Sequence, residues 1–276
     1  MIIQFESVNL FVSESGPSDS EKKLVLLHGF SGSGEVFESV IDILTASGVR
    51  CLAIDLIGHG KSEKTTDPRF YSMTFQVDAI NHIITTLCFT DSWLLGYSLG
   101  SRVALNYASK WGNHLIGLIL ESSNPGISND LERKTRYSDD QILAKKIRSD
   151  YESFIIQWNR LPLFRSPADS NRSRMNKFIQ LQRSQNPECI ALSIEGMSPG
   201  ITPFFSDQKL NEFDMPIEII TGETDLKYTD LWNQKSKNLP KLAHTIIEQA
   251  GHRVHLDNPS DYAEQVIRIL SKYQQN

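Results

Sequence analysis

Cysteine is scarce in this chain. The three cysteines, Cys51, Cys88 and Cys189, are odd in number, widely spaced and never arranged as a CxxC pair. This pattern argues against a disulfide framework and against a cysteine-rich zinc site. It predicts reduced thiols, as in a protein of the cytoplasm.

Long apolar runs are also missing. No stretch approaches the roughly 20 residues that a helix needs to cross a bilayer. The first residues, MIIQFESVNLFVSE, show neither a basic leader nor an unbroken apolar core. We therefore expect no signal peptide and no membrane insertion.

The chain also lacks an excess of positive charge. The 28 Lys and Arg residues are outnumbered by 33 Asp and Glu residues, which gives a net charge of -5. This balance argues against nucleic acid as a partner. The length of 276 residues, 39% of them hydrophobic, fits one large globular domain or one domain with an insertion.

The sequence does contain a regular alternation of strand and helix patterns. Residues 2–14 alternate apolar and polar side chains, as one half-buried strand does. Apolar runs typical of strands buried on both faces follow near residues 22–30, 49–55, 92–97, 115–122, 216–225 and 243–252. Amphipathic helical patterns lie near residues 35–47, 74–88, 98–111, 227–237 and 259–273. The order predicts an α/β fold, with a mostly parallel sheet flanked by helices.

The alternation is interrupted in the second half of the chain. From about residue 125 to residue 199 the patterns are helical, with no obvious strand. We expect residues 1–124 and 200–276 to form the α/β core and residues 125–199 to form a helical cap insertion that covers a pocket. Between Asn129 and Gln185 twelve Lys or Arg face seven Asp or Glu. A solvated helical face explains such a charge run, but an anionic ligand beneath the cap is the alternative.

One short motif carries chemistry. Gly96-Tyr97-Ser98-Leu99-Gly100 matches G-x-S-x-G, the pattern of a nucleophile elbow, in which a serine occupies a tight turn from strand to helix. The motif follows a predicted strand and opens a predicted helix, which is the context that the elbow requires. Ser98 is therefore the candidate catalytic serine.

A catalytic serine needs a histidine that accepts its proton and a carboxylate that orients the histidine. In elbow-type enzymes these partners follow the serine in the order carboxylate, then histidine. Asp225 and His252 stand just past the ends of two predicted strands, where open sheets build their sites. Glu223 remains an alternative orienting residue, and His255 remains an alternative base.

The segment LLHGFSGSG supplies the fourth part of such a site. The backbone N–H groups of Phe30 and Leu99 are candidates for an oxyanion hole, which stabilises negative charge on a reacting oxygen. We interpret His28 as a structural histidine whose ring is hydrogen-bonded to nearby loops.

This sequence resembles the α/β-hydrolase superfamily in three features taken together. They are the serine elbow, the order serine, carboxylate, histidine along the chain, and the segment LLHGFSGSG with its oxyanion-hole candidate. Several segments between about residues 24 and 260 narrow the resemblance: LHGFSGSGEVF, GYSLGSRVAL, ESSNPGI, ERKTRYSDD, FIIQWNRLPLF, LQRSQN and AGHRVHLDNP. Together they are similar to the 2-succinyl-6-hydroxy-2,4-cyclohexadiene-1-carboxylate synthases, lyases of menaquinone and phylloquinone biosynthesis.

The resemblance implies an elimination of pyruvate from a small polycarboxylate substrate, with no metal and no organic cofactor. That substrate bears three carboxylates, and the resemblance implies that Arg102, Arg136 and Arg183 bind them and that Tyr97 and Trp158 line the pocket. Guanidinium groups suit this role because they pair with carboxylates through two parallel hydrogen bonds. Two alternatives use the same fold: a serine hydrolase of esters or carbon–carbon bonds, and a non-catalytic ligand-binding protein.

Overall fold

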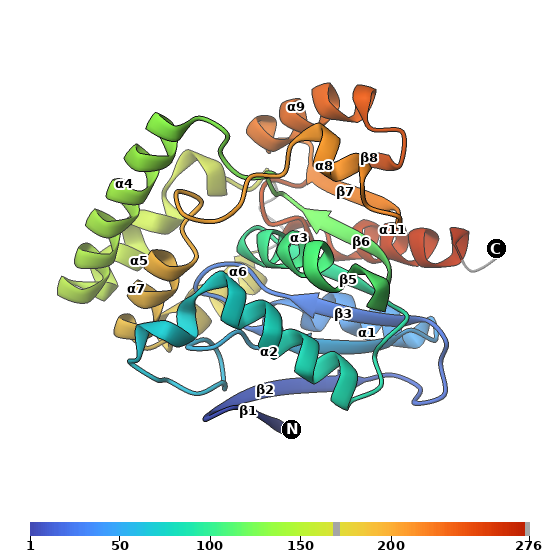
Figure 1. The fold of residues 1–276 in the computed structure, drawn as a ribbon, viewed down its shortest axis with the longest axis horizontal. Coiled ribbons are helices and arrows are strands. Elements are labelled where there is room, and N and C mark those ends of the chain that lie inside the picture. The colour runs from blue at the N-terminus through green and yellow to red at the C-terminus, as the bar shows by residue number, and fades with distance from the viewer. Residues whose placement is uncertain (168–171, 274–276) are drawn as a thin grey trace.

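An eight-stranded sheet forms the centre of the protein (Figure 1). The computed structural model describes residues 1–167 and 172–273. The sheet has the order β1-β2-β4-β3-β5-β6-β7-β8; the pairings β1–β2 and β2–β4 are antiparallel and all others are parallel. The strands are β1 (Ile2–Phe5), β2 (Val8–Ser15), β3 (Lys23–Leu27), β4 (Arg50–Ile54), β5 (Ser92–Tyr97), β6 (Leu115–Glu121), β7 (Ile217–Gly222) and β8 (Leu242–Ile247).

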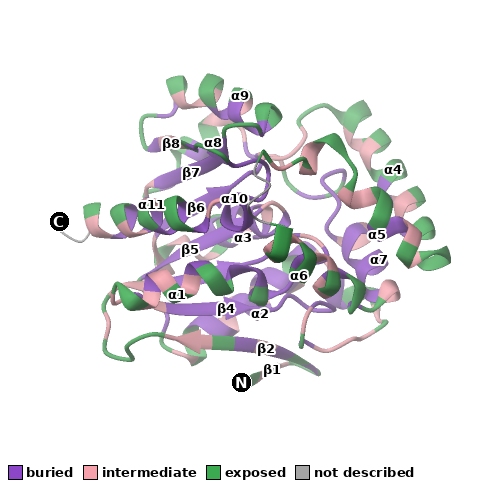
Figure 2. Cartoon of the chain, turned by 180° about the vertical axis from the view of Figure 1, so that it is seen from behind, coloured by how far each residue is buried: buried purple, intermediate pink, exposed green. Residues whose placement is uncertain are grey.

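The central strands coincide with the continuous apolar runs of the sequence. Every residue of β5 and β7 is buried, because helices cover both faces of the sheet (Figure 2). Strands that meet helices on both sides are therefore mostly apolar, and the buried carboxylate of Glu218 in β7 accepts a hydrogen bond from Tyr273 Oη at 3.0 Å. The predicted α/β architecture with a mostly parallel sheet is confirmed.

The first strand differs from the prediction. Residues 2–14 alternate as one strand would, but the structure divides them into the antiparallel hairpin of β1 and β2. Glu6, between the two strands, has φ of 49°, in the left-handed region that tight turns use. The period-two pattern continues through the turn, so the sequence alone shows no break.

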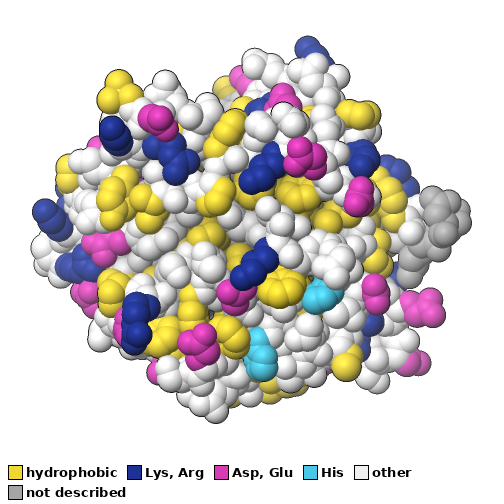
Figure 3. All heavy atoms as spheres, viewed as in Figure 1, with side chains coloured by type: hydrophobic (Ala, Val, Ile, Leu, Met, Phe, Trp, Pro, Cys, Tyr) yellow, Lys and Arg dark blue, Asp and Glu magenta, His cyan; other side chains and the backbone are white. Residues whose placement is uncertain are grey.

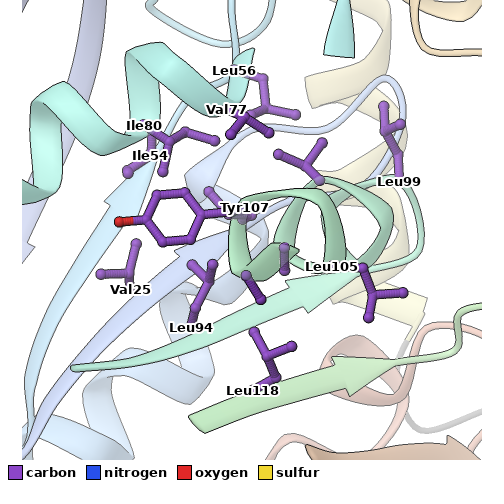
Figure 4. Close-up of a cluster of buried hydrophobic side chains, with 14 of the residues drawn as sticks. Val25, Ile54, Leu56, Val77, Ile80, Leu94, Leu99, Leu105, Tyr107 and Leu118 are labelled. Carbon is purple, nitrogen blue, oxygen red and sulfur yellow. The ribbon is translucent and has the colours of Figure 1, made fainter. Parts of the chain in front are cut away.

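Helices pack on the two faces of the sheet in separate layers. One layer contains α2 (Met73–Thr86) and α3 (Leu99–Trp111), and its core surrounds the fully buried ring of Tyr107 (Figure 4). The other layer contains α1 (Glu38–Ala46), α10 (Val254–Asp257) and α11 (Pro259–Lys272). Two further helices, α8 (Asp207–Asn211) and α9 (Leu226–Lys235), flank β7 in sequence. Within the described residues, no helix combines the length and apolarity needed to span a membrane.

Four of the described helices between β6 and β7 form what we call the cap, on the left in Figure 1. They are α4 (Asp130–Ser149), α5 (Tyr151–Asn159), α6 (Arg172–Arg183) and α7 (Pro187–Gly196). Asn129, Asp150 and Asn186 cap α4, α5 and α7 by accepting hydrogen bonds from backbone N–H groups of the first turn. The boundaries at residues 125 and 199 stay a prediction, and residues 168–171 of that range lie outside the described residues.

The cap has a small core of its own. Ile147 of α4, Phe154 of α5 and Ile190 of α7 are buried together in one cluster, against which Phe30 of the α/β core packs. Basic and acidic side chains are interspersed on the face of the molecule that Figure 3 shows. Arg136, Arg148 and Arg183 of the cap form ion pairs with Asp140, with Glu188 and Glu195, and with Glu152, respectively.

The register of the sheet brings distant loops to one edge. Leu27 of β3 is the partner of Gly96 in β5, so the loop that contains Phe30 leaves the sheet beside Ser98. Gly222 of β7 is the partner of Ile247 in β8, so the segments after these strands also leave together. These loops are where a site is expected in a parallel sheet.

Candidate active site

Ser98 occupies a strained turn between β5 and α3. Its φ of 50° and ψ of -105° lie outside the regions that most residues adopt. The backbone N–H of Ser98 donates a hydrogen bond of 2.9 Å to the carbonyl of Glu121 in the neighbouring strand, which holds the turn in place. The turn presents the hydroxyl at the start of α3.

Two glycines make this turn possible. A Cβ atom on Gly96 would lie 2.4 Å from the backbone of Gly100, and a Cβ on Gly100 would lie 2.2 Å from the carbonyl oxygen of Leu27. Neither contact can be relieved by moving a side chain, because the neighbouring atoms are backbone. The glycines of the motif are thus required by the close approach of helix and strands.

Replacing Gly100 with alanine should lower the free energy of unfolding by about 3 kcal/mol, since the added methyl group forces backbone apart. Gly48→Ala is the control, because Gly48 has φ of 82° but open space around it, so that only a conformational cost of about 1 kcal/mol applies. Urea unfolding of both variants measures the difference. Equal losses would contradict the role of close packing at Gly100.

The structure brings Ser98, His252 and Asp225 together. His252 Nε2 lies 3.4 Å from Ser98 Oγ, and His252 Nδ1 lies 2.9 Å from Asp225 Oδ2. The side chains of His252 and Asp225 are each only 1% exposed. The distance of 3.4 Å is at the long end for a hydrogen bond, as is common for catalytic pairs without bound substrate.

The two alternatives that the sequence left open lie elsewhere. Glu223 is exposed and accepts a hydrogen bond from the N–H of Gln249. His255 is fully buried and pairs with Glu121 at 2.8 Å, below the site. Neither side chain is in contact with His252 or Ser98 through any interaction found in the described part of the chain.

Phe30 and Leu99, the predicted backbone donors, line the same cavity as the serine. The cavity has a volume of about 140 Å³, and His252 also lines it. Neither N–H donates a hydrogen bond to any residue that the structure describes. Both are therefore free to receive an oxygen that becomes negatively charged.

The cavity contains cationic side chains and no acidic ones among its described lining residues. These are Phe30, Ser98, Leu99, Arg102, Ser122, Ser123, Asn124, Arg136, Trp158, Leu163, Phe164, Ser193, Ile194, Met197, Pro199, Lys227, Tyr228 and His252. Its volume is below the roughly 300 Å³ at which typical ligand sites begin. Trp158 and Phe164, whose ring centroids lie 5.3 Å apart, are among its lining residues.

Arg102 and Arg136 are held in this cavity by different contacts. Arg102 Nη1 donates to the carbonyl of Met197 at 2.7 Å, and burial lowers the pKa of Arg102 to about 10, with a further contribution from the positive charge of Arg136. Arg136 Nε donates to both oxygens of Asp140, at 3.0 and 2.9 Å. Asp140 also accepts from Ser198 Oγ at 2.6 Å. Each guanidinium group keeps donors for a ligand.

Comparison with known proteins agrees with this fold. The family model described as the alpha/beta hydrolase fold matches residues 22–259, which is most of the chain. The chain belongs to the α/β-hydrolase fold family.

Named relatives of this α/β-hydrolase point to one group within the family. A Bacillus subtilis protein provisionally named 2-succinyl-6-hydroxy-2,4-cyclohexadiene-1-carboxylate synthase is 33% identical over 271 residues, which cover 96% of both chains. A Pectobacterium atrosepticum protein with the same name, without that reservation, is 32% identical over 90% of this chain and 93% of its own. The solved structure of MenH from S. aureus superposes with a TM-score of 0.88 at 26% identity, covering 95% of this chain and 98% of the other.

Two of the residues predicted to meet a ligand are not among the residues that line the cavity of this α/β-hydrolase. Arg183 lies on α6, and its side chain is 38% exposed and paired with Glu152 at 2.5 Å. Tyr97 is buried beneath the site, where its ring packs 5.6 Å from the ring of His252 and 4.6 Å from that of His255. The structure brings Trp158, but neither Arg183 nor Tyr97, to the cavity beside Arg102.

Sequence reasoning missed several lining residues, among them Lys227 and Tyr228. Both stand in the first turn of α9, directly after Asp225. The ring of Tyr228 lies 5.0 Å from the ring of His252. Their position next to the orienting carboxylate was the available signal, because the first turn of a helix that follows Asp225 stays near the same edge of the sheet.

Arg253, the residue after the candidate base, joins the cap to the α/β core. It is 3% exposed, its Nη2 donates to Asn159 at 2.8 Å, and its guanidinium carbon lies 4.2 Å from the ring centroid of Phe164 and 4.7 Å from that of Phe178. Burial lowers the pKa of Arg253, and the neighbouring Tyr97 partly opposes the shift. The pairing of a buried cation with aromatic faces stabilises the closed cap.

His28 is structural, as the sequence indicates. Its Nε2 accepts the N–H of Leu56 at 3.0 Å and its Nδ1 donates to the carbonyl of Gly29 at 2.8 Å, an arrangement that only the neutral ring can make. Burial lowers the pKa of His28, and burial together with repulsion from His28 lowers the pKa of the neighbouring His59 further.

These two buried rings predict a stability that depends on pH. The ordinary pKa of a histidine ring is 6.5, so below that pH these two rings bind protons in the unfolded chain but stay neutral in the folded protein. Above pH 6.5 these groups should not change the free energy of unfolding. As the pH is lowered below 6.5, the free energy of unfolding should decrease by up to about 1.4 kcal/mol per pH unit for each ring. Urea unfolding from pH 7.5 to 5.5 measures this slope, and His59→Gln should reduce it. An unchanged stability at pH 5.5 would contradict the assignment.

No three potential metal-ligating side chains (His, Cys, Asp or Glu) gather closely enough to hold an ion within residues 1–167 and 172–273.

Proposed function

We propose that this α/β-hydrolase is a carbon–oxygen lyase of menaquinone or phylloquinone biosynthesis. It eliminates pyruvate from 2-succinyl-5-enolpyruvyl-6-hydroxy-3-cyclohexene-1-carboxylate and leaves 2-succinyl-6-hydroxy-2,4-cyclohexadiene-1-carboxylate, the compound in the names of both bacterial relatives. The observation that carries the proposal is one cavity that joins a serine–histidine–aspartate relay to two guanidinium groups, in a chain similar to those relatives over nearly its whole length.

In the proposed mechanism the serine acts as a base and not as a nucleophile. His252, oriented by the carboxylate of Asp225, accepts the proton of Ser98 Oγ. The serine oxygen then removes the proton from ring carbon 2 of the substrate. This proton is acidic because the carbon stands between the succinyl ketone and the ring double bond.

The electrons of the broken carbon–hydrogen bond move through the ring. They form a double bond between carbons 2 and 3, the original double bond shifts to carbons 4 and 5, and the bond from carbon 5 to the enolpyruvyl oxygen breaks. The leaving enolate takes up a proton and becomes pyruvate. The step requires neither an oxidant nor a reductant, and neither a metal nor an organic cofactor.

Negative charge accumulates on the ketone oxygen during proton removal. In this proposal the N–H groups of Phe30 and Leu99, two residues that line the cavity, donate hydrogen bonds to that oxygen, and such donors typically contribute several kcal/mol to the transition state. Arg102 and Arg136 bind carboxylates of the substrate and so hold carbon 2 against Ser98.

The three cysteines, all unpaired in the structure, support a cytoplasmic location.

The direct test is incubation of the purified protein with the enolpyruvyl substrate. Pyruvate, measured by coupled reduction with lactate dehydrogenase, and the diene absorbance should rise together in equal amounts. A burst of product from a p-nitrophenyl ester, with turnover far above that of pyruvate release, would favour the serine hydrolase instead. Tight binding of the substrate without any change in it would favour the non-catalytic alternative.

A further inference from the structure

The mouth of the cavity contains a lysine that the relay and the two arginines do not account for. Lys227 is the second residue of α9, two positions after Asp225, and it lines the same cavity as Ser98 and His252. Its side chain is exposed, and its only recorded contact places Nζ 5.3 Å from the ring centroid of Tyr228. Across the described residues it forms no ion pair and no hydrogen bond.

The charges that surround the cavity are unbalanced. Arg102, Arg136 and Lys227 contribute three positive charges, and none of the described lining residues is acidic. The nearest carboxylates are already engaged: Asp140 is paired with Arg136 from outside the cavity, and Asp225 is paired with His252 behind it. Three converging cations, of which Arg136 alone is paired with a carboxylate among the described residues, suit a ligand that brings several anionic groups.

The third cation cannot be Arg183 in this arrangement. Arg183 Nε and Nη2 donate to the carboxylate of Glu152 on the cap surface, at 2.5 to 3.1 Å. Lys227 is free of such a partner and already lies at the cavity. An ammonium group binds a carboxylate as a point charge with three donors, so it can capture a flexible carboxylate chain at the mouth without imposing one orientation.

We propose that Lys227 is the third carboxylate-binding residue of this pocket, beside Arg102 and Arg136. The identity of the ligand as a tricarboxylate rests on the proposed function. The assignment of Lys227 to a carboxylate rests on its place at the cavity and on the charges around it.

Steady-state kinetics of Lys227→Met, compared with Lys237→Met, test the assignment. Lys237 is an exposed lysine just beyond α9 and away from the cavity, so it controls for the loss of one surface charge. We expect Lys227→Met to raise KM for the enolpyruvyl substrate about tenfold and to change kcat less than threefold, whereas Lys237→Met leaves both unchanged. Lys227→Arg, which keeps the charge, should restore KM to within about threefold of the wild type.

Arg183→Met is the competing variant. If KM rises in Arg183→Met and stays at the wild-type value in Lys227→Met, the third cation is Arg183 and the proposal is wrong. The proposal is supported if KM increases in Lys227→Met and Lys227→Arg reverses the increase, whatever the KM of Arg183→Met. Loss of kcat with unchanged KM in Lys227→Met would also overturn the proposal, because a binding residue at the mouth does not act on the chemical step.

A binding measurement separates this proposal from the proposed function. Titration calorimetry uses 1,2,3-propanetricarboxylate as a trianionic probe and glutarate as a dianionic one, and neither can be turned over. The wild type should bind 1,2,3-propanetricarboxylate more tightly than glutarate. In Lys227→Met the difference between these two affinities should be smaller. A protein that shows this pattern but releases no pyruvate would refute the lyase and leave Lys227 as a carboxylate site. Equal affinities in the wild type, or a difference unchanged in Lys227→Met, would overturn the assignment of Lys227.

Discussion

Ser98→Ala should reduce pyruvate release by about 10³-fold or more. Alanine has no oxygen that could remove the ring proton, and in the proposed mechanism His252, whose Nε2 lies 3.4 Å from Ser98 Oγ, acts on the substrate only through that oxygen. Substrate affinity should stay within a few fold of the wild type, because Arg102 and Arg136 are unchanged. Coupled pyruvate assays and calorimetry of the variant measure the two quantities separately.

The same helix provides a matched control. Ser109 is exposed on α3, eleven residues beyond Ser98, so Ser109→Ala removes a hydroxyl from this helix without touching the cavity. It should keep full turnover. If Ser98→Ala retained turnover within tenfold of the wild type, His252 or a water molecule would have to be the base, and the proposed mechanism would fail.

Asp225→Asn should cost about 10³-fold in kcat with little loss of stability. The carboxylate of Asp225 accepts the hydrogen bond of His252 Nδ1 at 2.9 Å, which keeps the proton on that nitrogen and leaves Nε2 free to accept from Ser98. An asparagine amide can donate to Nδ1 instead and so stabilise the wrong tautomer of the ring. The size of the loss measures how much of catalysis depends on the orientation of the imidazole.

Glu223→Gln is the comparison that decides between the two carboxylates. Glu223 is exposed and holds only the N–H of Gln249, so its variant should stay within twofold of the wild type in kcat. The opposite outcome, a large loss in Glu223→Gln and none in Asp225→Asn, would make Glu223 the orienting residue. Thermal unfolding of both variants separates a catalytic loss from a folding defect.

Much of the fold could be predicted from the sequence because its determinants are local. Strands β3, β5 and β7 appear as largely apolar runs, interrupted in β7 by the buried Glu218 and Thr221, because burial on both faces removes the alternation of apolar and polar residues. The spacing of Gly96, Ser98 and Gly100 identifies the elbow for a similar reason: each glycine is required because backbone atoms lie too close to leave room for a Cβ.

The direction of long side chains could not be predicted in the same way. Arg183 and Arg136 both stand on cap helices and look alike in the sequence, but one pairs with Glu152 at the surface and the other lines the cavity. Which of them faces inward depends on how four helices pack onto the sheet. Lys227 could not be singled out in the sequence, because a lysine two residues after Asp225 has no signature that distinguishes it from an ordinary surface lysine.

The contacts of Arg253 limit how the cap can be exchanged. A chimera that places the cap of another family member on this core would have to supply an amide at position 159 and aromatic rings at positions 164 and 178, or leave a guanidinium enclosed without partners. The cap and the loop after β8 therefore depend on each other through these contacts. Recombination between relatives should succeed only where both segments are inherited together.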